Sequence, residues 1–294
     1  MTLTVPRNVI VWLDISEWGP KILDFVGGLI SRDVTNKIRT SLILRFVQDD
    51  REYCNYQDLA RLLQRQLDAV GMRRPILDLM ADWLRKEYSH VRVFHACHPV
   101  DVKSYYTDGI VTHGPGALKD RAREYFLTNA LPEVTPETLE RAIVKADEEF
   151  EYDGQIYFAL DDRDLKLSGH YLIYGSEYLE LLAAHLKRQT GKDCFAILRS
   201  IGIPTMFACD LPFSYIESQT PERISGLCGR LLEHSFYEPV WPQGELPLGD
   251  LSFRIGIPLP PSLIVSHYHP TEILDDLDGS LYRAVQSKCL LCDL

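Results

Sequence analysis

Apolar residues recur at helical spacing in the first part of the chain. In QDLARLLQRQLDAV they fall at positions 59, 62, 63, 67 and 70, which form one face of a helix. PILDLMADWLRKEY repeats the pattern, with Pro75 in the first turn, where its missing N–H is tolerated. PKILDFVGGLISRD has similar spacing, although each glycine weakens a helix by about 1 kcal/mol relative to alanine. Residues 1–88 are therefore predicted to form a mainly helical N-terminal unit, which also contains a buried strand over 8–14.

The pattern changes after residue 88, where short β-prone runs alternate with helical segments. Thr135 followed by Pro136 is typical of a helix start, and a glycine at 109 or 202 is typical of a helix end. Residues 39–47 fit either a strand or a helix. The pattern predicts helices over 117–130, 135–150, 176–188, 192–202 and 221–235, and strands over 155–160, 170–174, 203–212, 251–257 and 262–268. The predicted fold class is α+β, with domains at 1–88 and 89–294.

Composition and charge narrow the function. The chain has 294 residues, of which 46% are hydrophobic, and a net charge of −11. An acidic chain of this kind disfavours general nucleic-acid binding, which depends on Lys and Arg neutralising phosphates. No signal peptide and no apolar run of membrane-spanning length is present, and the seven cysteines are an odd number. These features predict reduced thiols, a cytoplasmic location and no contact with a membrane.

Metal binding is the main competing chemistry for the cysteines. His95, Cys97 and His98 together with Cys289 and Cys292 offer enough ligands for a tetrahedral zinc site. Only one CxxC pair exists, however, and neighbouring residues of a strand over 91–98 point to opposite faces. The sequence therefore predicts no metal site.

Two stretches carry candidate chemistry. In VRVFHACHPVDVKSYYTDGI a β-prone run leads to His95, and a helix follows that closes on Gly109 and Ile110. In GQIYFALDDRDLKLSGHYLIYGSEYLELLA a strand carries Tyr157, a second strand carries Tyr171, and a helix opens at Ser176. Polar residues at strand ends lie at a sheet edge, where ligands have access. The two stretches are predicted to hold one nucleotide-sized ligand.

These stretches resemble the two motifs of the ADP-ribosyltransferase superfamily, on the branch shared by poly-ADP-ribose polymerases and diphtheria toxin. The first family motif pairs a strand-end histidine with a helix closing on Gly-Leu or Gly-Ile, as in 95–110. The second is Gly-X-Tyr-Phe-Ala-like and corresponds to 154–159. The resemblance covers roughly 90–180 well and 203–268 loosely. It implies a split β-sheet core with flanking helices, and NAD as the substrate.

The resemblance also implies roles for individual residues. His95 would bind the ribose hydroxyls on the adenosine side, and Tyr157 would stack on the nicotinamide ring. Tyr171 and Ser176 would line the same NAD site, although Tyr171 also suits a core position and Ser176 a helix N-cap. A carboxylate would support the oxocarbenium-like transition state.

The catalytic carboxylate is where the chain departs from the family. The usual late-strand glutamate has no counterpart in LSFRIGI. Glu217 ranks first as the catalytic acid because it follows the strand over 203–212 at a suitable offset; Asp210, Asp250 and Glu177 rank behind it. RNA 2′-phosphotransferases share the fold without this glutamate, so its absence does not by itself imply an inactive protein.

The resemblance thus implies transfer of ADP-ribose from NAD to a macromolecular acceptor, as in intracellular bacterial toxins or defence effectors. An antitoxin or a regulatory protein would then be a natural partner. Two alternatives remain open: a non-catalytic, antitoxin-like binding protein of the same fold, and an NAD glycohydrolase that needs no acceptor.

Overall fold

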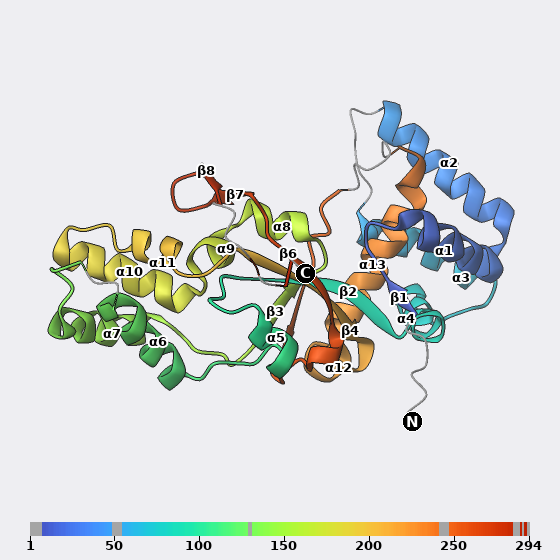
Figure 1. The fold of residues 1–294 in the computed structure, drawn as a ribbon. Coiled ribbons are helices and arrows are strands. Elements are labelled where there is room, and N and C mark those ends of the chain that lie inside the picture. Colours follow the sequence, from blue (N-terminus) through green and yellow to red (C-terminus); the bar gives the residue numbers. More distant parts are fainter. Residues whose placement is uncertain are drawn as a thin grey trace, which may run out of the picture. The chain divides into compact units, whose positions relative to one another are not determined.

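The computed structural model describes residues 8–48, 55–128, 131–240, 247–284, 289 and 291–292. The chain divides into two compact units, Met1–Val93 with Asp210–Phe253, and Phe94–Cys209 with Arg254–Leu294 (Figure 1). Strands β2 (His90–Cys97), β4 (Thr205–Pro212) and β5 (Ser252–Ile255) each contain one of the boundaries. The two predicted domains met at residue 88; instead, the first unit also takes in Asp210–Phe253.

The first unit is mainly helical, as predicted. A two-residue strand, β1, pairs in parallel with the start of β2. Helix α13 packs against four other helices of this unit, so burial of its apolar face requires the N-terminal segments. Residues 39–47 are helical. The elements are β1 (Val9–Ile10), α1 (Ile15–Ile30), α2 (Arg32–Gln48), α3 (Tyr56–Ala69), α4 (Ile76–Glu87), α12 (Phe213–Gln219), α13 (Glu222–Tyr237) and a 3-10 turn (Glu238–Val240).

The second unit combines helices with antiparallel strands, which confirms the α+β class. Its helices are α5 (Lys103–Asp108), α6 (Pro115–Thr128), α7 (Pro136–Glu149), α8 (Asp162–Leu167), α9 (His170–Tyr174), α10 (Glu177–Thr190) and α11 (Phe195–Ser200), with a 3-10 turn at Pro261–Leu263. Its other strands are β3 (Ile156–Ala159), β6 (Ile264–Tyr268), β7 (Glu272–Asp275) and β8 (Ser280–Arg283).

The main sheet has the strand order β5-β3-β2-β4-β6, with β1 added beside β2. Strand β2 pairs antiparallel with β3 at Phe94 and Ala159, and β4 pairs antiparallel with β6. A separate hairpin of β7 and β8, which the sequence pattern did not predict, forms a two-stranded sheet. Within the described part of the chain, no helix is long and apolar enough to cross a membrane.

Local sequence signals explain the long helices of the second unit. The Ser176 hydroxyl accepts from the Leu179 N–H at 3.3 Å and caps α10, which ends at Gly191 in the left-handed conformation. At α7 the Thr138 hydroxyl completes a capping box with Thr135, although the usual acid is missing. Both helices bury an apolar face in a common core that also includes α6 and α11.

The strand predicted over 170–174 is wrong, because this segment forms helix α9. Gly169 and Gly175 bracket it, and its first amides bond back to the Gly169 carbonyl. Leu172, Ile173 and Tyr174 are all buried, a pattern that a strand with one solvated face does not give. Packing against α10, α11 and β7 therefore overrides the β-propensity of the segment.

Candidate functional site

His95 lies where strands β2 and β3 meet. Its Nδ1 is 2.9 Å from the carbonyl oxygen of Tyr157, and its ring packs on Phe158 at 5.6 Å between centroids. Burial lowers the pKa of His95, so the imidazole is neutral at pH 7. Neutral His95 donates its Nδ1–H to the Tyr157 carbonyl and keeps Nε2 as an acceptor. The histidine thus connects the two strands that carry the predicted motifs.

The Tyr157 ring points away from this histidine. Tyr157 is 43% exposed whereas the next residue, Phe158, is 2% exposed, and neighbouring residues of a strand face opposite ways. Because His95 packs on Phe158, the two predicted ring contacts to NAD come from opposite faces of β3. The Tyr157 hydroxyl donates to Asp153, which raises its pKa, and Arg254 of β5 lies within hydrogen-bonding reach of that hydroxyl.

A polar cluster forms where helix α9 leads into α10. The Tyr171 hydroxyl donates to Glu177 at 2.6 Å, and the His170 ring lies 4.0 Å from the Tyr171 ring. The pKa of Tyr171 is raised by burial first, then by Glu177, and further by the nearby Tyr157. Burial, opposed by His170 and assisted by neighbouring carboxylates, raises the pKa of Glu180. Shifted pKa values of this kind are typical of functional sites.

Three of the predicted NAD-site residues thus come from this region of the second unit, but in different roles. Tyr157 presents an exposed ring, and Tyr171 holds Glu177. Ser176 acts through its hydroxyl as the cap of α10 and so fixes the position of the neighbouring Glu177. Arg254, which the sequence motifs did not indicate, supplies a cation beside Tyr157.

Glu217, the first-ranked acid, belongs to the first unit. Its carboxylate is held by Arg85 at 2.5 Å, between α12 and α4. Asp210 forms a largely buried ion pair with Arg92 at 2.6 Å, and Asp250 lies 3.6 Å from Arg230. Each of these three carboxylates has an arginine partner within the first unit. Glu177 is the acid that the structure brings together with Tyr171.

The closest grouping of metal-ligand side chains lies elsewhere in the second unit. One ligand atom from each of His267, His269, Cys289 and Cys292 lies within 4.8 Å of the other three. The two histidines alternate with Tyr268 on β6 and therefore share a face. The Cys292 N–H bonds to the Cys289 carbonyl at 3.0 Å, which places both thiols on one turn.

The sequence reasoning paired these cysteines with the wrong histidines. Cys97 and His98 are buried, and their side chains bond to the backbone carbonyls of Thr205 and Leu172 respectively. The second pair of ligands comes instead from the His-x-His spacing in SHYHP, which matches the two-residue period of a strand. The expectation of no metal rested on the lack of this second pair.

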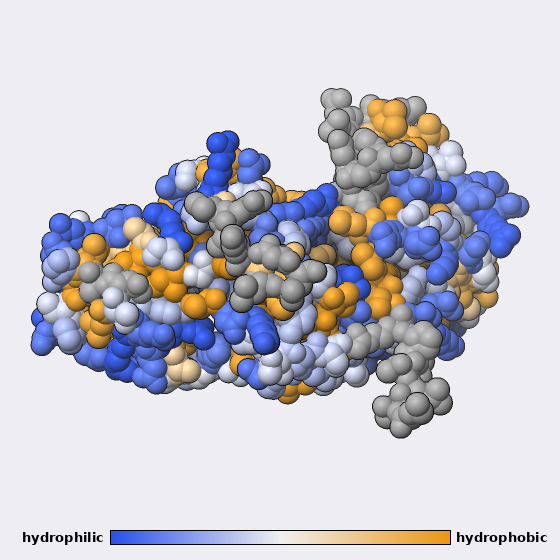
Figure 2. Space-filling model, in the orientation of Figure 1, coloured by the Kyte–Doolittle hydropathy of each residue, from blue (hydrophilic) through white to orange (hydrophobic). Residues whose placement is uncertain are grey.

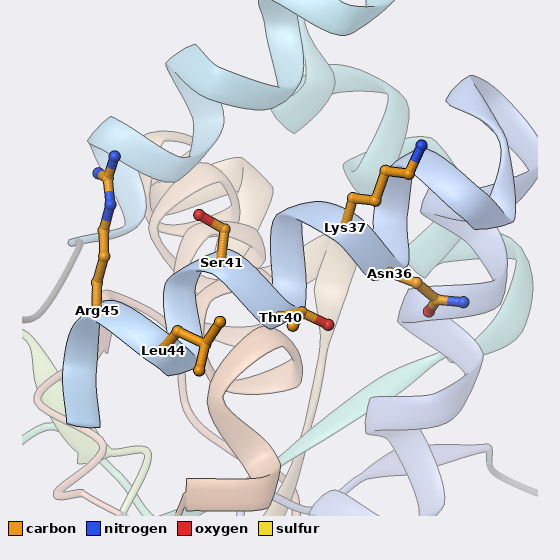
Figure 3. Close-up of a pocket in the computed structure, with 6 residues that line it drawn as sticks. All are labelled: Asn36, Lys37, Thr40, Ser41, Leu44 and Arg45. Carbon is orange, nitrogen blue, oxygen red and sulfur yellow. The ribbon is translucent and has the colours of Figure 1, made fainter. Parts of the chain in front are cut away.

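A surface hollow on the first unit has no comparable chemistry. Figure 3 shows its lining residues along one exposed side of α2. None of the predicted site residues is among Asn36, Lys37, Thr40, Ser41, Leu44 and Arg45. On the visible face of the molecule, hydrophilic and hydrophobic residues are interspersed (Figure 2). We therefore centre the functional argument on the second unit.

Comparisons with known proteins leave the chain without a relative from which function can be read. A scan against protein-family models, a search of curated proteins and a search of solved structures each found no match.

Proposed function

We propose that the second unit binds NAD and transfers ADP-ribose to a macromolecular acceptor. The observation that carries the proposal is the convergence of Tyr157, Tyr171 and Glu177, which come from the second of the two motif-like stretches. The limited pairing of β2 and β3, registered at Phe94 and Ala159, agrees with strands that separate beside the motifs. These features support the family resemblance at the residues that it implicates.

The chemistry assigns each group a task. The exposed Tyr157 ring offers a flat face for the nicotinamide, and Arg254 offers a cation for the pyrophosphate. The bond between nicotinamide and ribose breaks with its electrons passing to nicotinamide, which leaves positive charge on the ribose. The Glu177 carboxylate, oriented by the Tyr171 hydroxyl, stabilises that charge until the acceptor attacks and releases its proton.

His95 takes a positioning role in this scheme. Its imidazole holds the Tyr157 carbonyl and packs on the opposite side of β3 from the Tyr157 ring. It therefore acts on NAD through the placement of β3. This differs from the ribose contact that the family resemblance implies for His95.

The test of the proposal is the charge on Glu177. Glu177→Gln keeps the size of the side chain and its contact with Tyr171 but removes the negative charge. We expect NAD affinity to stay within a few-fold and ADP-ribose transfer to fall roughly 10²–10³-fold, the scale of one electrostatic group in a transition state. Labelled NAD with a cell lysate measures transfer, and calorimetry measures NAD binding.

Glu137→Gln is a matched control, because Glu137 is also a first-turn acid of a helix, α7. It should leave transfer unchanged. Glu217→Gln distinguishes the two acids: loss of transfer there, with Glu177→Gln active, would return the catalytic role to Glu217. Label recovered only as free ADP-ribose would instead indicate an NAD glycohydrolase. Absence of both binding and turnover would support the non-catalytic alternative.

A further inference from the structure

We propose that His267, His269, Cys289 and Cys292 bind one zinc ion in a closed, structural site. The two thiols approach the same ring nitrogen, His267 Nε2, at 3.5 Å from Cys289 Sγ and 3.2 Å from Cys292 Sγ. A tetrahedral zinc ion, with bonds of about 2.3 Å to sulfur and about 2.1 Å to nitrogen, separates a sulfur and a nitrogen ligand by about 3.6 Å. The distances in the cluster match that geometry.

The second nitrogen of each histidine is already engaged. His267 Nδ1 is 2.8 Å from the Tyr106 hydroxyl, and His269 Nδ1 is 2.9 Å from the Pro204 carbonyl. A carbonyl only accepts, so His269 carries its proton on Nδ1 and presents a bare Nε2. Outer contacts of this kind fix the tautomer and the ring orientation of metal-bound histidines. Both rings thus present Nε2 to the thiols.

Hydrogen bonding alone does not account for the cluster. Nε2 of a neutral histidine accepts one hydrogen bond, yet two thiols converge on His267. In addition, His269 Nε2 is buried and has no hydrogen-bond partner. One cation at the centre satisfies all four ligand atoms at once, as the two thiols release their protons and bind as thiolates.

The donor set selects the metal and its role. Two thiolates and two imidazoles in tetrahedral arrangement are typical of Zn²⁺. Four protein ligands leave no position for substrate, so the ion would be structural. It would fasten the Cys289–Cys292 turn to β6 and, through Tyr106, to α5. The site stands apart from the NAD proposal, because none of its ligands takes part in the transfer chemistry.

The decisive experiment is metal analysis of the whole protein, purified under reducing conditions without a metal-binding tag. We expect about one zinc ion per chain, and at least a tenfold lower content in the double variant Cys289→Ser/Cys292→Ser. Cys194→Ser is the control, because Cys194 is a buried cysteine of α11's first turn and not a ligand. It should retain zinc.

A second measurement on the unaltered protein does not depend on how the variants fold. After zinc is removed with a chelator, added Co²⁺ should give the intense visible spectrum of tetrahedral cobalt with thiolate ligands, which added Zn²⁺ should abolish. Wild-type protein with no bound zinc and no such spectrum would overturn the proposal. So would zinc that persists in the double cysteine variant, or a Cys289–Cys292 disulfide in the reduced protein.

Discussion

Gly109→Ala should destabilise the protein more than any other glycine substitution in the second unit's motif regions, by about 3–5 kcal/mol. Gly109 ends α5 with φ 84° and ψ −168°, a region of backbone conformation that is essentially open to glycine alone. A Cβ there would lie 2.1 Å from the Leu259 carbonyl oxygen. That oxygen accepts the Ile110 N–H at 2.9 Å, and the Leu259 N–H bonds back to Ile110 at 2.8 Å. The added methyl group would therefore break this reciprocal pair.

Chemical denaturation followed by fluorescence measures the change, and Gly191→Ala is the matched control. Gly191 also has positive φ, at 72°, but no atom lies within 4 Å of the Cβ position. Its substitution should cost only about 1 kcal/mol, the usual conformational penalty. Equal losses at both positions would show that the contact with Leu259 contributes nothing. The result also bears on the Gly-Ile motif, because it gives Gly109 a packing role that is independent of NAD.

Acid should destabilise the first unit through His234. This side chain on α13 is 2% exposed, and its ring meets the Trp12 ring edge-on at 4.7 Å. Burial, reinforced by Arg230, lowers the pKa of His234 from 6.5 to about 4. Above pH 6.5 the imidazole is neutral in both the folded and the unfolded chain, so it adds no pH dependence. Between pH 6.5 and about 4 only the unfolded chain takes up the proton, and stability falls with pH.

The expected loss from this group is about 3 kcal/mol between pH 7 and pH 4, since each pKa unit corresponds to about 1.4 kcal/mol. His234→Phe keeps a ring beside Trp12 and removes the titration. The free energy of unfolding, measured at pH 7 and pH 4, should therefore drop about 3 kcal/mol less in the variant than in the parent protein. Carboxylates and other histidines contribute alike to both proteins. An identical drop in the two would show that His234 is protonated in the folded state.

The two proposed sites make separate demands on the second unit. The NAD proposal depends on side chains near the start of α10, where the Ser176 cap and the Tyr171 hydroxyl fix the approach of Glu177. The zinc proposal depends on β6 and the Cys289–Cys292 turn. Loss of zinc with NAD binding intact, or the reverse, would separate them experimentally.

The sequence by itself determined the elements whose signals are local. Helix α7 begins at Thr135, α10 is capped by Ser176, and α5 ends at Gly109, each at the predicted position. The strand β4 also lies within the predicted range. Caps and apolar periodicity act over a few residues, so the printed sequence contains all the information they need.

Only the tertiary structure decided which elements pack together and which side chains meet. The helix α13 was predictable, but its membership of the first unit depends on apolar partners more than a hundred residues away. The segment 170–174 became a helix because its neighbours bury three successive residues. His267 and Cys289 meet through the placement of β6, and Glu177 rather than Glu217 reaches Tyr171. Such contacts join distant parts of the chain, and their formation depends on the packing of the whole unit, which no local pattern records.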